Sequence, residues 1–285
     1  MTGFSEKKNK SKNQLNNKKN IMLRKKLIAQ AFENHSKGDF KAAEKYYEKF
    51  ISNGFHDAKV YSNYAILFKE TSRENEALDL LDKLTDKYPN NPEFYAIISD
   101  IFRSQGKLEK AQVSIEKAIN INPDVANYHF NLGLIFIGLK ILSKAVISLK
   151  QAIIINPKFI EAHLNLFSVQ MDLSNLSEAE SSIKKAIKLD PNSSISHFNL
   201  SRIHLELGRD VEAEASVKKA IAIQPCFPQA YNNLGIILKS LDKPLEAEVS
   251  TRKAIELKDD YVEAYYNLGN ILRFIGKNEE AFECT

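Results

Sequence analysis

Asparagine recurs at one position of a 34-residue spacing, and its side chain is suited to holding a polypeptide backbone. The six residues are Asn63, Asn131, Asn165, Asn199, Asn233 and Asn267. An asparagine amide both donates and accepts hydrogen bonds, so it can match the N–H and C=O groups of an extended peptide without reading its side chains. Because asparagine is a poor helix former, six recurrences within predicted helices indicate a role beyond filling space. We therefore treat the six as candidate peptide-binding residues.

Histidines recur at the same spacing, two residues before three of these asparagines. His129, His163 and His197 stand where tyrosine occurs in four sibling segments. Zinc needs ligand nitrogens at ~2.0–2.1 Å, whereas equivalent residues on stacked helices are separated by roughly 8–10 Å. We therefore expect these histidines to pack like the tyrosines they replace, with a polar tip, and we expect no metal site.

The residue types that carry catalysis do not form a recognisable constellation. The ten glycines are scattered and form no phosphate-binding loop, and no metalloprotease or nucleophile-elbow motif occurs. Neither Cys226 nor Cys284 lies in an arrangement that activates a thiol. We expect no catalytic residues, no cofactor and no enzymatic activity in this chain.

Repeated pairs of helices must position the asparagines. With Pro228 as position 1 of a 34-residue frame, apolar residues return every three or four positions and predict two amphipathic helices per repeat. A repeat this short cannot bury its apolar face alone, so stacking on its neighbours has to supply the core. The asparagines occupy position 6, at the edge of the apolar face of the first helix.

Small residues mark where the two helices of a repeat approach each other. Position 20 is alanine in every repeat: Ala43, Ala77, Ala111, Ala145, Ala179, Ala213, Ala247 and Ala281. Position 27 is alanine in five repeats, with Phe50 and Leu84 in the first two, and position 8 is small except for Phe167. Small side chains let helices pack closely. We expect the first two repeats to pack differently and Phe167 to be a local departure.

Glycine and proline divide the frame. Gly38, Gly106, Gly208 and Gly276 fall at position 15 and predict the turn between the two helices, because glycine accepts a left-handed cap conformation. Proline at position 32 of five repeats predicts the end of each second helix. The predicted domains are a disordered basic tail and an array of seven full repeats with part of an eighth. Their bounds are 1–23 for the tail, 24–285 for the array, and 24–57, 58–91, 92–125, 126–159, 160–193, 194–227, 228–261 and 262–285 for the repeats.

Leu132 and Gly133, followed by Ala145, Ala152 and Pro157 at these intervals, resemble the tetratricopeptide repeat. The resemblance covers residues 24–285. It implies an all-α fold, a right-handed α-solenoid or superhelix of 34-residue helix-turn-helix repeats, with the first helix of each pair lining the concave face. The asparagine column is similar to the asparagine ladder that grips polypeptide substrates in the repeat region of O-linked N-acetylglucosamine transferases.

Two functions from different classes follow from this pattern. The first is a protein-interaction scaffold that binds an extended polypeptide in the concave groove. The alternative is the substrate-recruiting N-terminal region of a larger transferase, a glycosyltransferase before a sulfotransferase or methyltransferase, whose catalytic domain is absent from this chain. The last repeat stops within its second helix, which led us to expect that the natural chain continues.

Charge and composition set the expected compartment and exclude other partners. Residues 1–26 carry nine Lys or Arg against Glu6 alone, so the net charge of +4 divides into +8 there and −4 in the array. We expect a solubilising role for this tail, and nucleic acid as a partner only through it, because no aromatic residue interleaves its lysines. With two cysteines and no run of eighteen apolar residues, we expect a soluble cytoplasmic protein. No small-molecule substrate is evident, and the sequence predicts no oligomeric state.

Overall fold

The computed structural model describes the backbone of residues 3–284 and the side chains of residues 17–284. Over these residues the chain forms sixteen helices and no strand. They are α1 (Gly3–Ser36), α2 (Phe40–Ser52), α3 (Ala58–Glu70), α4 (Glu74–Lys87), α5 (Pro92–Ser104), α6 (Leu108–Ile121), α7 (Ala126–Gly138), α8 (Leu142–Ile155), α9 (Ile160–Asp172), α10 (Leu176–Leu189), α11 (Ser194–Glu206), α12 (Asp210–Ile223), α13 (Pro228–Ser240), α14 (Pro244–Leu257), α15 (Val262–Phe274) and α16 (Asn278–Glu283).

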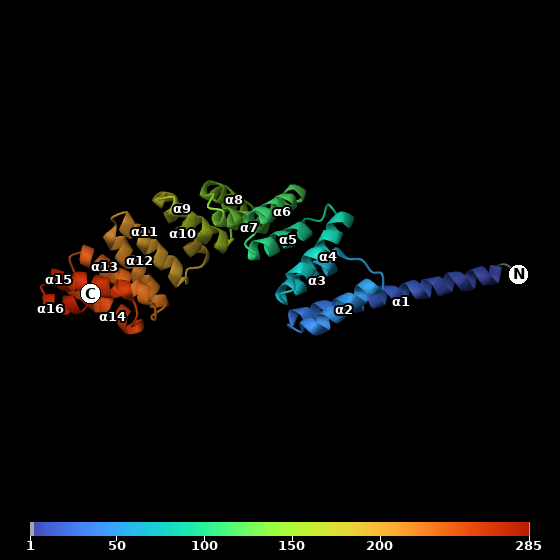
Figure 1. Cartoon of the computed structure of the whole chain (residues 1–285), viewed down its shortest axis with the longest axis horizontal. Coiled ribbons are helices and arrows are strands. Elements are labelled where there is room, and N and C mark those ends of the chain that lie inside the picture. The colour runs from blue at the N-terminus through green and yellow to red at the C-terminus, as the bar shows by residue number, and fades with distance from the viewer. Residues whose placement is uncertain (1–2, 285) are drawn as a thin grey trace. The chain divides into compact units, whose positions relative to one another are not determined.

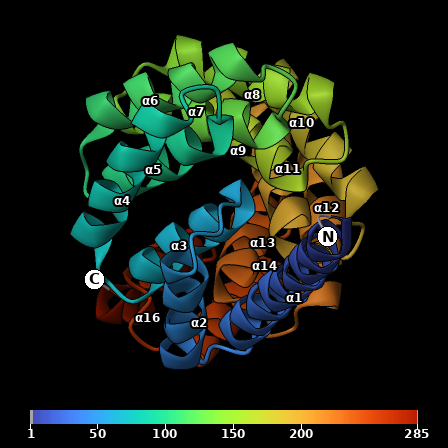
Figure 2. The ribbon, with the colours of Figure 1, turned by 90° about the vertical axis from the view of Figure 1, so that its right-hand side faces the viewer.

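The chain divides into two compact units, which we call the N-terminal unit (Met1–Leu139) and the C-terminal unit (Lys140–Thr285). Within each unit, consecutive helices pack against each other as antiparallel pairs, and each pair packs on the next (Figure 1). In the C-terminal unit, α13 and α14 lie beside α11 and α12, and Figure 2 gives this arrangement from a second direction.

The helices follow the 34-residue frame. From α3 to α15, each odd-numbered helix begins at position 1 and has 13 residues. From α4 to α14, each even-numbered helix begins at position 17 and has 14 residues. The end of α14 needs no proline: this helix ends at Leu257 although Asp259 replaces the proline at position 32. Packing against its neighbours therefore sets the length of this helix as well.

The turn within each repeat is made by one residue with a positive φ. Position 15 has φ between 56° and 84° in all eight repeats, at Gly38, Ser72, Gly106, Lys140, Ser174, Gly208, Asp242 and Gly276. The sequence predicted the turn at the four glycines only. At the other four repeats, stacking imposes the same left-handed conformation on a residue with a Cβ, which costs free energy.

Alanine at position 20 lies in the interior of every repeat. All eight of these alanines are at most 1% exposed. At position 8, Gly235 also serves close packing, because a Cβ there would overlap Thr251 Oγ1 on α14. Phe167 occupies the same position in α9 and is buried against Ala179, Ile183 and Leu200. The expected local departure is therefore absorbed into the core of its own repeat.

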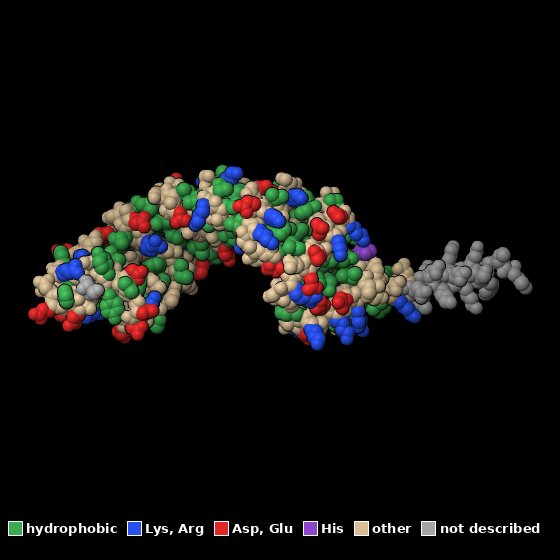
Figure 3. Space-filling view, viewed as in Figure 1, with side chains coloured by type: hydrophobic (Ala, Val, Ile, Leu, Met, Phe, Trp, Pro, Cys, Tyr) green, Lys and Arg blue, Asp and Glu red, His purple; other side chains and the backbone are tan. Residues whose placement is uncertain are grey.

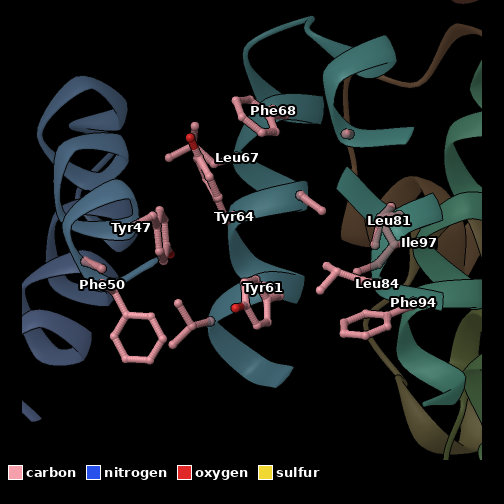
Figure 4. Packing of buried hydrophobic residues seen from close by; sticks show 14 of the residues in the cluster. Tyr47, Phe50, Tyr61, Tyr64, Leu67, Phe68, Leu81, Leu84, Phe94 and Ile97 are labelled. Carbon is pink, nitrogen blue, oxygen red and sulfur yellow. The ribbon is translucent and has the colours of Figure 1, made fainter. Parts of the chain in front are cut away.

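Aromatic side chains build much of the core of the N-terminal unit. Tyr47 on α2 stacks on Tyr64 on α3, with ring centroids 5.2 Å apart, and Tyr64 contacts Phe68 one helical turn later. Figure 4 shows this cluster continuing through Leu84 to Phe94. Phe50 is fully buried where later repeats have alanine. The larger residues at position 27 are thus filled in by aromatic packing.

The odd-numbered helices form one layer within each unit. Beyond its own pair, α13 contacts both α11 and α15, and α5 contacts both α3 and α7. Among the described residues, no two even-numbered helices contact each other to that extent. Closer spacing on the odd-numbered side means that these helices lie on the inner side of each unit's curvature. The asparagines at position 6 belong to this layer.

The tail predicted to be disordered is helical in the described backbone. Helix α1 runs through Gly3–Ser36 and so includes most of residues 1–23. The sequence there has no proline after position 1 of the chain and is rich in Lys, Asn and Gln, so a helix anchored by buried Leu27 and Ala31 can continue toward the N-terminus. Arg24 pairs with Asp57 at 2.7 Å and therefore belongs to the first repeat. The side chains of Lys7, Lys8, Lys10 and Lys12 lie outside the described residues.

Candidate functional site

The six asparagines at position 6 occupy equivalent places on odd-numbered helices but have different surroundings. Five are partly exposed, and Asn233 is buried at 8% exposure. In α3 and α9 the side chains of Asn63 and Asn165 donate to backbone carbonyls one turn earlier, at Lys59 and Glu161, over 2.8 Å. No hydrogen bond of the side chains of Asn131 and Asn199 is found among the described residues.

Asn233 and Asn267 are already used between repeats. The Nδ2 atom of Asn233 donates to Ser201 Oγ on α11 over 2.9 Å, and this bond is buried. The Nδ2 atom of Asn267 donates to Asn232 Oδ1 on α13 over 3.0 Å. These two side chains therefore help to join neighbouring odd-numbered helices. The structure separates the predicted column into four asparagines that leave an amide oxygen uncommitted and two that hold the stack together.

The helix face around Asn199 offers both polar and apolar contacts. Positions 2, 6 and 9 share one face of an α-helix because of its 3.6-residue period, so Ile195, Asn199 and Arg202 lie together on α11. Ile195 is 58% exposed, and Arg202 is also exposed. On α15, Tyr266 at position 5 is 63% exposed beside Asn267. The sequence reasoning missed these flanking residues, although their spacing of three or four from position 6 would have identified them.

The histidine column has a structural role in all three repeats. The Nε2 atoms of His129, His163 and His197 lie 2.8, 3.1 and 3.0 Å from the carbonyl oxygens of Pro123, Pro157 and Pro191, respectively. A carbonyl oxygen only accepts, so each Nε2 carries the proton and donates it. Each histidine thereby ties the first helix of its repeat to the turn that precedes it. This matches the interpretation of packing residues with a polar tip.

A second recurrent pattern joins neighbouring repeats and was not predicted. Glutamate at position 21 pairs with the basic residue at position 16 of the next repeat: Glu44 with Arg73, Glu180 with Arg209, Glu214 with Lys243, and Glu248 with Lys277. The distances are between 2.7 and 3.1 Å. The face of the molecule in Figure 3 accordingly carries acidic and basic side chains interspersed over both units.

The charge pairing lowers the pKa of these glutamates. In Glu180 and Glu214 the hydrogen bonds from Lys184 and Lys218 on the same helix are the main cause of the lowered pKa. For Glu248, burial alone would raise the pKa, but the bonds from Lys277 and Arg252 outweigh it and the pKa is lowered. These carboxylates are therefore ionised across the neutral range and contribute to stacking.

Neither a metal centre nor a membrane-spanning helix is found in the part of the chain that the structure describes. No group of three or more His, Cys, Asp or Glu side chains there has the arrangement of a metal site. None of the described helices is both long and apolar enough to cross a bilayer.

Models of one repeat family match four segments of the chain. The matching families are described as TPR repeat for residues 100–139 and as tetratricopeptide repeat for residues 164–231, 228–261 and 251–283. A comparison with curated protein sequences finds no match.

Solved structures share the fold at low sequence identity. A crystal structure of MamA protein is 22% identical over 60% of this chain and 93% of that one, with a TM-score of 0.57. YrrB, described as a TPR protein with an unusual peptide-binding site, is 18% identical over 65% and 95% of the two chains, with a TM-score of 0.59. A tetratricopeptide repeat protein from Parabacteroides merdae is 17% identical over 88% and 99%, with a TM-score of 0.57. The chain therefore carries tetratricopeptide repeats, folded as an all-helical solenoid of helix-turn-helix pairs.

Proposed function

We propose that this protein is an interaction scaffold that binds an extended polypeptide along the asparagine-bearing face of its odd-numbered helices. The observation that carries the proposal is the set of half-exposed amides at Asn63, Asn131, Asn165 and Asn199, whose oxygens are not committed within the fold. Such oxygens can accept backbone N–H groups of a bound peptide. The fold shared with YrrB, a TPR protein with a peptide-binding site, supports the same proposal.

Within the C-terminal unit we assign binding to Asn165 and Asn199. Asn199 has no partner in the described chain, and Asn165 has only a bond to its own helix. Exposed Ile195 and Arg202 flank Asn199 on α11. Backbone pairing by the amides would hold the peptide, and these flanking residues would choose among sequences. Asn233 contributes indirectly, because its bond to Ser201 fixes α13 against α11.

A peptide array tests this assignment with a matched control. The double variant Asn165→Ala, Asn199→Ala is compared with the wild type and with a variant in which Asn175, Asn192 and Asn278 are changed to Ala. The control asparagines are exposed and lie in turns or at a helix start, off the proposed face. Each lost hydrogen bond is worth about 0.5–1.5 kcal/mol, so we expect about tenfold weaker binding by the double variant and unchanged binding by the control. Equal binding by all three proteins would remove the asparagines from the mechanism.

The alternative of a transferase's recruiting region, with its resemblance to the O-linked N-acetylglucosamine transferase repeats, gains no support from the comparisons above. It stays a hypothesis about residues that this chain does not contain. Nucleic acid as a partner through residues 1–26 and a cytoplasmic location likewise stay predictions.

A further inference from the structure

A cleft of about 350 Å³ opens between α8 and α10 of the C-terminal unit, with α9 as its floor. Its walls include Ile153 and Ile154 on α8 and Ser182 on α10, and its floor includes His163 and Gln170. It lies between the even-numbered helices and is therefore distinct from the asparagine-bearing face. The volume falls within the range of small-molecule sites, about 300–1,000 Å³.

The floor of this cleft is polar where equivalent clefts are apolar. Between α4 and α6 the corresponding floor positions, 4 and 11, hold Tyr95 and Phe102. Beside α15 they hold Tyr265 and Leu272. Here they hold His163 and Gln170, each only 3% exposed. Two polar side chains thus replace a tyrosine and a large apolar residue at the bottom of one cleft.

One polar atom on this floor has no partner. His163 Nε2 donates to the Pro157 carbonyl, which leaves Nδ1 as an acceptor in the neutral ring. This Nδ1 atom is buried and makes no hydrogen bond within the described chain. Gln170 cannot satisfy it, because its amide nitrogen is best placed to donate to Ser182 Oγ at 2.7 Å and to the carbonyls of Glu178 and Leu166. A buried acceptor without a donor is unfavourable and is relieved by any ligand that supplies one.

The rim of the cleft carries two lysines on opposite walls. Lys150 on α8 and Lys185 on α10 both line it and are exposed, and no ion pair of either is found among the described side chains. Glu178 on the same rim leaves a net charge of +1. Exposed Ile154, at 70%, and the partly buried Ile153 form the apolar wall below.

We propose that this cleft binds a small organic acid with an apolar body, a hydroxyl or other hydrogen-bond donor at one end and a carboxylate at the other. The donor meets His163 Nδ1 at the floor, the body lies along Ile153 and Ile154, and the carboxylate lies between Lys150 and Lys185. The site does not depend on the peptide-binding face, so changing Asn165 and Asn199 leaves it intact.

Three related probes test each part of this assignment by isothermal titration calorimetry at pH 8. 4-Hydroxyphenylacetate has the donor and the carboxylate, phenylacetate lacks the donor, and 4-hydroxyphenylacetamide lacks the charge. A buried hydrogen bond changes affinity by about tenfold. We expect wild type to bind the first probe about tenfold more tightly than the second, and more tightly than the third.

Variants then locate the binding. His163→Phe removes both ring nitrogens, whereas the control His197→Phe removes the same kind of bond to a proline carbonyl one repeat later. We expect the first variant to bind the two acids equally and the control to keep the tenfold difference. Lys150→Met and Lys185→Met are expected to weaken both acids and to leave the amide probe unchanged, and these variants decide the matter if His163→Phe fails to fold. Binding of no probe by wild type, or full discrimination by folded His163→Phe, would overturn the proposal.

Discussion

Position 15 provides a pair of substitutions whose effects on stability have opposite signs. Gly208 and Ser174 occupy it in neighbouring repeats, with φ of 68° and 58°. The residues that follow them, Arg209 and Asn175, both donate from their backbone N–H to a carbonyl of the preceding helix over 2.8 Å. A Cβ added at Gly208 would meet no atom within 4 Å. Any effect of Gly208→Ala therefore comes from the backbone conformation alone.

The magnitude follows from two opposing terms. The left-handed conformation costs a residue with a Cβ about 1–2 kcal/mol. Replacing glycine by alanine returns about 0.4–1 kcal/mol, because the unfolded chain becomes less flexible. We expect Gly208→Ala to lower the free energy of unfolding by about 1 kcal/mol. Ser174→Gly removes the strain at an exposed site and is expected to raise it by about the same amount.

Urea unfolding followed by circular dichroism measures both changes. Hydrogen exchange of the amides in α9–α12 should place them in the affected repeats, because each repeat contacts only its neighbours. Ser168→Gly is the control: Ser168 is exposed within α9, where glycine is a poorer helix former than serine by about 0.5 kcal/mol, so this change should destabilise. Destabilisation by Ser174→Gly, or no effect of Gly208→Ala, would refute the idea that stacking imposes strain at this position.

Three further predictions concern contacts between helices and between repeats. Gly235→Ala should destabilise by about 1–3 kcal/mol because its Cβ overlaps Thr251 Oγ1; adding Thr251→Ala should recover part of the loss in urea unfolding, and full additivity would contradict the overlap. Glu214 and Lys243, with side chains 14% and 42% exposed, should show a coupling of about 0.5–1 kcal/mol in a double-mutant cycle of Glu214→Gln and Lys243→Met; zero coupling would make the pair incidental. Because the folded pKa of Glu180, Glu214 and Glu248 is lowered, their contribution is complete above the ordinary glutamate pKa of about 4.3 and is lost as pH falls through the folded values; a wild-type acid titration of stability should therefore be steeper below about pH 4.3 than that of Glu214→Gln.

The sequence predicts helix placement well because the same packing problem is solved in every repeat. Alanine at position 20 must be small wherever two helices meet closely, so its recurrence sets the frame in which α3–α15 begin. Proline at position 32 marks the end of five second helices. Yet α14 ends at the same position without it, which shows that neighbour packing sustains what local signals only mark.

Other features depend on partners that are distant in sequence. Ser72 and Ser174 gave no sign of a left-handed turn, because the stacked helices impose that conformation. Asn199 and Asn233 look identical in the sequence, and only the placement of Ser201 in α11 makes one of them structural. The pairing of Glu214 with Lys243 joins residues 29 apart across two repeats. Its recurrence at positions 16 and 21 was present in the sequence, but its meaning required the geometry of stacking.

The central claim is that uncommitted asparagine amides on the odd-numbered helices hold a peptide backbone. The most direct measurement is a titration of ¹⁵N-labelled protein with the tightest peptide from the array, following the side-chain amide signals of asparagine by NMR. The account predicts that the signals of Asn165 and Asn199 shift together with backbone amides of α9 and α11, while those of Asn175, Asn192 and Asn278 stay in place. Shifts confined to even-numbered helices, with the Asn165 and Asn199 signals unmoved, would contradict it.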